Sequence, residues 1–159
     1  MCGIIGYIGK REALPLLLDG LKKMEYRGYD SAGIALQGNP SVTAVKAVGK
    51  ILNLEKKLED FSSLNSKATL GIGHTRWATH GGVTEANAHP HTDCQGDIWL
   101  SHNGIVENYR ELKAELISSR HTFYSETDTE VIAHLIEETK KKNPKFHFEE
   151  AVRAALKKI

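Results

Sequence analysis

The chain has 159 residues, 40% of them hydrophobic and 26% charged, which is enough for one domain with a sizeable core. Its 21 basic and 20 acidic residues nearly balance, so we expect no nucleic-acid partner. No apolar stretch approaches the roughly 18 residues of a membrane span, and the N-terminus lacks the pattern of a signal peptide. Because no such span is present, we expect no membrane partner. Two cysteines, Cys2 and Cys94, make no disulfide framework, so we expect a reducing, cytoplasmic location.

The first half of the chain predicts strands that alternate with helices. The Gly-rich apolar run at 3–9 is typical of a buried strand, and leucines at helical spacing follow it. Gly20 lies inside that helix at a cost of about 1 kcal/mol against alanine, which indicates close packing there. Further strands are expected at 33–37, 42–48 and 69–75, with a turn at 38–41 and a second helix that carries Ile51, Leu54, Leu58 and Phe61.

The second half predicts more helix than strand. A long irregular stretch at 76–96 precedes a strand at 97–102, and helices follow around 109–116, after Thr127 and around 148–159. The pattern Thr127-x-x-Glu130 predicts a capping box at the start of the middle helix, and Pro144 ends that helix. Strands that occur both in succession and between helices favour a layered α+β domain, spanning 1–159.

The second residue carries the strongest chemical signal. Removal of Met1 would leave Cys2 with a free α-amine beside its thiol, which joins a base and a nucleophile in one residue. Such amines titrate at about pH 7.7–8.0 and are therefore partly unprotonated in the cell. With Met1 attached, the nitrogen is an amide and is not basic, so we expect the Met1-bearing chain to be inactive.

Polar residues also gather in three later segments, each beside a predicted strand. Buried without partners they would cost about 1–3 kcal/mol each, so they are poor core material. The segments are YRGYDSAG at 26–33, HTRWATHG at 74–81 continuing to 91, and HNG at 102–104 together with SETDTE at 125–130.

These motifs, in this order, resemble the glutaminase domain of the glutamine–fructose-6-phosphate aminotransferase (glucosamine-6-phosphate synthase) family, a branch of the class II amidotransferases. CGI and HNG are shared widely in that class, whereas the three longer strings are specific to this branch. The resemblance implies a four-layer αββα sandwich of the N-terminal nucleophile hydrolase type. It also implies hydrolysis of L-glutamine to glutamate and ammonia, with no metal or organic cofactor.

Catalytic roles follow from the resemblance residue by residue. Cys2 matches the nucleophile, whose sulfur forms a γ-glutamyl thioester. Asn103 and Gly104 match the oxyanion hole, where two N–H groups stabilise the charge on the former carbonyl oxygen.

Substrate-binding roles follow in the same way. Arg76 matches the clamp on the α-carboxylate of glutamine, since a guanidinium can form two parallel bonds to it. Thr79 and His80 are expected to help there, Trp77 to cover the bound glutamine, and Asp128 to bind its α-ammonium. Asp128 has an alternative role, because acids in a first helical turn are favoured by the helix dipole alone.

Arg27 and Asp30 match the family pattern near the nucleophile. An Arg–Asp pair there either supports catalysis or braces the loop, and bracing is the favoured interpretation.

A metal site is the main alternative from another class. Its ligands would be His74, His80, His89, His91, His102 and Cys94. The sequence has no metalloprotease spacing and no CxxC pair, so we expect no metal.

Length opens two further alternatives. The family's glutaminase domain extends beyond this chain, and its sugar-phosphate isomerase domain comes later still, so we expect a C-terminally incomplete sandwich without the isomerase domain. The missing strands would leave a sheet edge unpaired, which predicts reduced stability or a homo-oligomer through that edge.

The chain could also be a non-catalytic glutamine-binding fragment, or the glutaminase half of another class II enzyme such as amidophosphoribosyltransferase or asparagine synthetase.

Overall fold

A four-stranded antiparallel sheet forms the centre of the N-terminal half in the computed structural model, which describes residues 2–38, 41–65 and 67–159. Its strands are β1 (Gly3–Ile8), β2 (Ser31–Gln37), β3 (Val42–Val48) and β4 (Leu70–Arg76), in the order β1-β4-β2-β3. These bounds agree with the predicted strands to within two residues. Met1, the middle of the turn at 38–41 and the side chain of Phe61 lie outside the described part, so the expectations about them stay untested.

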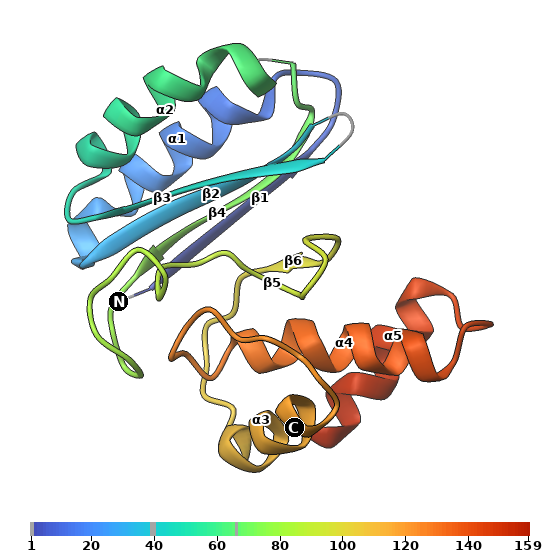
Figure 1. Cartoon of the computed structure of the whole chain (residues 1–159). Helices are drawn as coiled ribbons and strands as arrows, with labels where there is room; N and C mark the ends of the chain where they lie inside the picture. The colour runs from blue at the N-terminus through green and yellow to red at the C-terminus, as the bar shows by residue number, and fades with distance from the viewer. Residues whose placement is uncertain (1, 39–40, 66) are drawn as a thin grey trace.

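Two helices cover one face of this sheet (Figure 1). They are α1 (Ala13–Lys23), which the short helix η1 (Glu25–Arg27) follows, and α2 (Ile51–Asn65). Their leucines pack on alternate residues of the strands, such as Ile34 and Val45. The expected close contact at Gly20 is confirmed, because a Cβ atom there would lie 1.9 Å from Cδ1 of Ile5.

The second half of the chain lies against the other face of the sheet. The short ribbon of β5 (His91–Thr92) and β6 (Trp99–Leu100) comes next, and a layer of helices lies beyond it (Figure 1). These helices are α3 (Tyr109–Ser118), α4 (Glu130–Lys142) and α5 (Phe148–Ala155), with η2 (Leu156–Lys158) at the end. They share a second apolar core. The order helix, sheet, sheet, helix is the predicted αββα arrangement.

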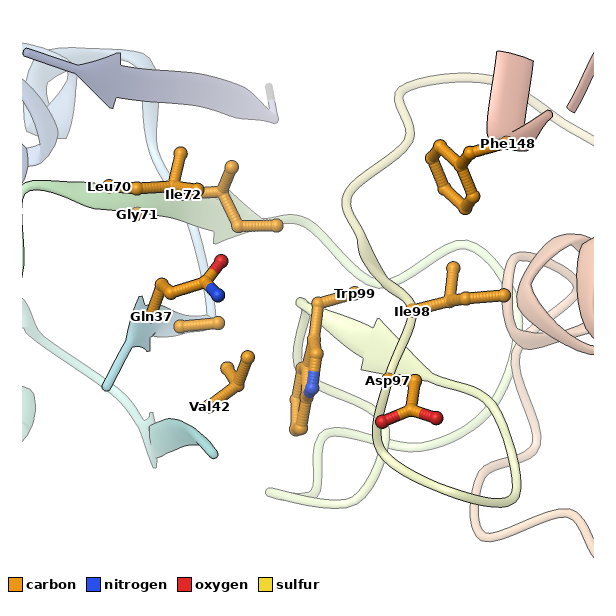
Figure 2. A pocket seen from close by; sticks show the side chains of 10 residues that line it. Gln37, Val42, Leu70, Gly71, Ile72, Asp97, Ile98, Trp99 and Phe148 are labelled. Carbon is orange, nitrogen blue, oxygen red and sulfur yellow. The ribbon is translucent and has the colours of Figure 1, made fainter. Parts of the chain in front are cut away.

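An apolar cavity of about 280 Å³ separates the two halves on one side (Figure 2). Leu70 and Ile72 of β4 line it from the first sheet, and Trp99 and Phe148 line it from the second half. Asp97 is the only titratable side chain among the described residues that line it.

The predicted capping box at Thr127 is wrong. Helix α4 begins at Glu130, and the hydroxyl of Thr127 lies 3.0 Å from Nε2 of His91 instead of capping the helix. The Glu130 carboxylate accepts hydrogen bonds from the backbone N–H groups of Tyr124 and Ser125, at 2.8 and 2.7 Å. The acid in the first turn thus holds the preceding loop rather than the helix end.

Within the described residues, no helix combines the length and the apolar character that crossing a bilayer requires.

Candidate active site

One pocket of about 230 Å³ brings together all eight residues that the sequence analysis assigned to catalysis and substrate binding. It lies where the N-terminus meets the loop that follows β4, and Figure 1 shows that end of the sheet beside the loops of the second half. The lining includes Cys2, Arg76, Trp77, Thr79, His80, Asn103, Gly104 and Asp128. Segments more than 100 positions apart in the chain therefore form one site.

Strand register positions Cys2. Gly3 pairs with Thr75, so the residue before β1 lies next to the end of β4, where the Arg76–Trp77 segment begins. The backbone N–H of Trp77 donates to Sγ of Cys2 at 3.2 Å. Sγ also lies 3.7 Å from the carbonyl oxygen of Trp77, so the backbone of this residue holds the sulfur at the edge of the pocket.

Asn103 is held from behind by a histidine. Nε2 of His74, a fully buried residue of β4, lies 2.9 Å from Oδ1 of Asn103. With Nε2–H donating to the amide oxygen, the Nδ2 group of Asn103 is the part left to donate into the pocket. His74 was not assigned to the site from the sequence, although it opens the HTRWATHG motif.

Gly104 packs against a second histidine. A Cβ atom at Gly104 would lie 2.6 Å from Nε2 of His102, and Nδ1 of that ring lies 3.3 Å from the hydroxyl of Thr129. A side chain at position 104 would displace a ring that is held from its other side. Glycine therefore allows the backbone at 104, which lines the pocket, to lie close against this ring.

Arg76, the last residue of β4, is 3% exposed and holds its own loop. Nη1 donates to the carbonyl of Gly82 at 3.2 Å, and Nη2 to those of His80 and Gly81. These bonds use at most three of the five guanidinium donors, so N–H groups remain for an anion in the pocket.

Asp128 brings a buried carboxylate to the opposite wall. The residue is 4% exposed, just before α4, and its Oδ2 accepts a hydrogen bond of 2.7 Å from the backbone N–H of Val106. The pocket thus contains one cationic and one anionic side chain. That pair matches the two charged groups of an amino acid.

Trp77 and His80 complete the rim. The Trp77 side chain is 54% exposed, as expected for a residue at the mouth of a pocket rather than in the core. The His80 ring packs edge-on against Tyr109, with 5.5 Å between ring centroids.

Asp30 and Arg27 do not line this pocket. Asp30 accepts hydrogen bonds from the backbone N–H of Ala78 and, at 2.9 Å, from the hydroxyl of Ser31. Its backbone N–H also donates to the carbonyl of Arg76 at 2.8 Å. Asp30 therefore braces the loop that carries Arg76 and Trp77, which supports the bracing interpretation for this residue; Arg27 lies on the exposed helix η1.

Three of the histidines considered as metal ligands stack as neutral rings. His74 and His89 are parallel at 4.2 Å between centroids, and His91 packs on His89 at 4.5 Å. Burial lowers the pKa of His74 to about 4 and the pKa of His91 to about 3. These rings form a packed wall behind the pocket.

The comparisons with known proteins agree with this site. The model of a family described as the glutamine amidotransferase domain matches residues 37–145. Proteins named glutamine–fructose-6-phosphate aminotransferase [isomerizing] are 54% identical over 159 residues in Chlorobaculum tepidum and Pyrococcus horikoshii, covering all of this chain. The protein of that name from Gloeobacter violaceus is 60% identical over 136 residues, or 86% of this chain. The chain spans about a quarter of their length, since it covers 26%, 26% and 22% of them.

Two solved structures have the same fold. One is described as the allosteric regulatory enzyme of purine biosynthesis, with a TM-score of 0.79 and 31% identity. The match covers 99% of this chain and 33% of the chain in that structure. The other is the glutamine phosphoribosylpyrophosphate amidotransferase from B. subtilis, with a TM-score of 0.76 and 29% identity, covering 99% and 32%. The fold is thus the α+β sandwich of the N-terminal nucleophile type. The chain belongs to the glutamine amidotransferase domain family.

Proposed function

We propose that the chain hydrolyses L-glutamine to glutamate and ammonia through a thioester on Cys2. The observation that carries this proposal is the convergence of a thiol, an Asn-Gly pair, an arginine and an aspartate in one pocket of about 230 Å³. A carboxylate clamp, an ammonium partner and a nucleophile are what cleavage of an amino-acid amide needs.

The reaction begins at sulfur. The sulfur of Cys2, which the Trp77 N–H contacts, loses its proton as it attacks the side-chain carbonyl carbon of glutamine and forms a C–S bond. The α-amine of Cys2, free once Met1 is removed, accepts the thiol proton and passes it to the leaving nitrogen. The C–N bond breaks and ammonia departs. Water then attacks the thioester, the C–S bond breaks, and glutamate and the thiol are regenerated.

Negative charge develops on the carbonyl oxygen in both steps. The amide N–H of Asn103 and the backbone N–H of Gly104 donate to it, each contributing about 3 kcal/mol to the rate. His74 acts through Asn103 as a positioning residue, because it holds Oδ1 at 2.9 Å.

The charged walls orient the substrate. Arg76 binds the α-carboxylate with donors that its own loop leaves available, and Asp128 binds the α-ammonium. Trp77, Thr79 and His80 close the pocket around the backbone of the amino acid and limit the access of water. Glutamine itself is the partner that this site selects, and no cofactor takes part in these steps.

We further propose that the ammonia serves the synthesis of glucosamine 6-phosphate from fructose 6-phosphate. Identities of 54–60% to proteins named glutamine–fructose-6-phosphate aminotransferase favour this branch over the branches of the two solved structures, which are 31% and 29% identical. The isomerase domain that completes this reaction in the family would be the partner of this chain, which acts in the cytoplasm.

The test is glutamate release from glutamine by protein whose Met1 has been removed, beside the variant Cys2→Ala. We expect the variant to lose activity completely and to keep the wild-type circular dichroism spectrum. Equal rates for both proteins would overturn the assignment. A glutamine-like diazo-oxo electrophile should alkylate Cys2 and leave Cys94 unlabelled, whereas binding without labelling would identify a non-catalytic fragment.

Variants of the two charged residues test substrate binding: Arg76→Lys keeps the charge but loses the planar guanidinium, and Asp128→Asn removes the charge. Arg76→Lys and Asp128→Asn should raise KM for glutamine at least tenfold. The matched controls are Arg110→Lys and Asp97→Asn, which change exposed groups outside the pocket and should leave KM unchanged.

Retention of Met1 provides a separate test of the base. Protein shown by mass spectrometry to keep Met1 should bind glutamine but release no glutamate, because its residue-2 nitrogen is an amide. Full turnover by that form would contradict the role of the α-amine.

A further inference from the structure

A second group of reactive side chains lies in the C-terminal half, outside the pocket. Cys94, His121, His134 and Glu137 each offer one ligand atom, and these four atoms lie within 4.8 Å of one another. Cys94 follows β5, His121 lies between α3 and α4, and the other two residues are three positions apart on α4. Three separate segments therefore converge on one point.

Five of the six distances between the four atoms lie between 3.1 and 3.5 Å, close to the spacing in a tetrahedral zinc site. Sγ of Cys94 lies 3.5 Å from Nδ1 of His121 and 3.4 Å from Nδ1 of His134. The two Nδ1 atoms are 3.2 Å apart, and they lie 3.1 and 3.4 Å from Oε2 of Glu137. Zinc bonds of about 2.0–2.3 Å in tetrahedral geometry put neighbouring ligand atoms about 3.3–3.6 Å apart.

The outer nitrogens of both rings face carboxylates. Nε2 of His121 lies 3.1 Å from Oε2 of Glu138, and Nε2 of His134 lies 3.5 Å from Oε1 of Glu130. The hydrogen bond from His121 Nε2 to Glu138 keeps the proton on that nitrogen, so that Nδ1 of His121 presents its lone pair, whereas Nε2 of His134 makes no hydrogen bond. Carboxylate–histidine pairs of this kind are the usual second layer around protein-bound metals.

Lone pairs that point at one another need a proton or a cation between them. Both imidazole side chains are at most 1% exposed, so water does not separate the two nitrogens. The second oxygen of Glu137 is held by Lys141 at 2.6 Å, which leaves Oε2 to face the rings. Cys94 is half-buried, whereas the other three ligands are buried.

We propose that Cys94, His121, His134 and Glu137 form a structural zinc site. A thiolate, two imidazoles and one carboxylate are a donor set that selects zinc over the hard cations magnesium and calcium. As the ion binds, the S–Zn bond forms and the thiol proton passes to solvent. The four protein ligands close the coordination sphere, so the site joins segments rather than catalyses a reaction.

Such a site would stabilise the half of the molecule that has the smaller sheet. It ties the segment after β5 and the loop before α4 to α4 itself, and the segment just before α4 carries Asp128 of the pocket. A metal was disfavoured because the sequence contains no metalloprotease spacing and no CxxC pair, and the candidate ligands beside Cys94 did not include His121, His134 or Glu137. Positions 94, 121 and 134 are too widely spaced to form a motif.

Cobalt substitution tests the proposal directly. The chain, stripped of metal and titrated with Co²⁺, should bind one ion and develop intense visible bands of tetrahedral cobalt with a thiolate-to-metal band in the near ultraviolet. Zinc should displace the cobalt and erase these bands. Weak octahedral bands without the thiolate band, or binding far below one ion per chain, would overturn the site.

Variants identify the ligands. Cys94→Ser should remove the thiolate band, whereas the matched control Cys2→Ser should keep it, because Cys2 lies in the other half. Glu138→Gln keeps all four ligands and should weaken zinc binding about 10- to 100-fold. If Cys94→Ser does not fold, Glu138→Gln still tests the site, because it keeps all four ligands. Unchanged affinity in Glu138→Gln together with an unchanged spectrum in Cys94→Ser would refute the proposal.

Discussion

At the scale of single residues, His74 does more than fill the core. Its contact with Oδ1 of Asn103 joins the centre of the sheet to the oxyanion donors. We expect His74→Leu to lower kcat about 10- to 100-fold with little change in KM, since loss of an oxyanion donor itself costs about 10²–10³ in rate. Steady-state glutaminase kinetics measure the split between the two constants.

Two further variants make this prediction specific. His74→Gln carries an N–H donor that can reach Asn103, and it should recover part of the lost kcat. His147→Gln changes an exposed histidine outside the site and should leave both constants unchanged. A rise in KM with normal kcat in His74→Leu would assign His74 to substrate binding instead.

The stacked histidines give stability a defined pH dependence. Burial lowers the pKa of His74 to about 4 and that of His91 to about 3, against 6.5 for an exposed ring. Between about pH 6.5 and 4 the unfolded chain therefore binds more protons than the native one, so stability is full above pH 6.5 and falls as the pH is lowered. His74 alone should remove about 2 kcal/mol between pH 7 and pH 5.

Urea unfolding at pH 7 and at pH 5 measures this loss. The difference in unfolding free energy between the two pH values should shrink in His74→Gln and stay unchanged in the exposed variant His147→Gln. A wild-type stability that does not vary across this range would mean that the native chain accommodates charged rings in the stack.

At the scale of elements, the contact between α1 and β1 depends on Gly20. Glycine to alanine inside an exposed helix stabilises by up to about 1 kcal/mol. Here the new methyl group would meet Cδ1 of Ile5 at 1.9 Å, so we expect Gly20→Ala to destabilise by about 1–3 kcal/mol. Adding Ile5→Val removes Cδ1, and the double variant should be more stable than the sum of the single effects predicts.

Denaturant unfolding of the four proteins in this cycle gives the coupling energy. If Gly20→Ala stabilises the protein, helix propensity outweighs the steric contact, and the Ile5 side chain moves aside without a cost in free energy.

Local pattern sufficed for most elements and for most of the site. The leucines of α1 and the strand runs carry their own periodicity. The sequence motifs already contain pocket residues such as Arg76 and Asp128. The prediction of a capping box was wrong because the pattern Thr127-x-x-Glu130 depends only on the local sequence. In the structure the Thr127 hydroxyl contacts His91, and the Glu130 carboxylate accepts hydrogen bonds from the backbone N–H groups of residues 124 and 125. The pair of His74 and Asn103 joins residues 29 positions apart, and no spacing rule detects it.

At the scale of the whole molecule, the two facing sheets differ in size. The first sheet has four strands, while its counterpart in the described residues has two strands of two residues each. β1 and β3 are the edges of the first sheet. Ile5 and Tyr7 of β1 pack toward α1 and α2, so the alternate residues Ile4 and Ile8 face the other side, where they are 43% and 79% exposed.

An exposed apolar edge of this kind favours pairing between copies of the chain. We therefore expect the isolated chain to self-associate through β1 at rising concentration, and Ile8→Lys to shift it toward monomer because a charge on an edge strand opposes pairing. Sedimentation velocity over a concentration series measures the shift. Ile117→Lys is the matched control, since Ile117 is 54% exposed but lies on α3. If both variants associate as the wild type does, or if the wild type stays monomeric throughout, β1 is not an interface between copies of the chain.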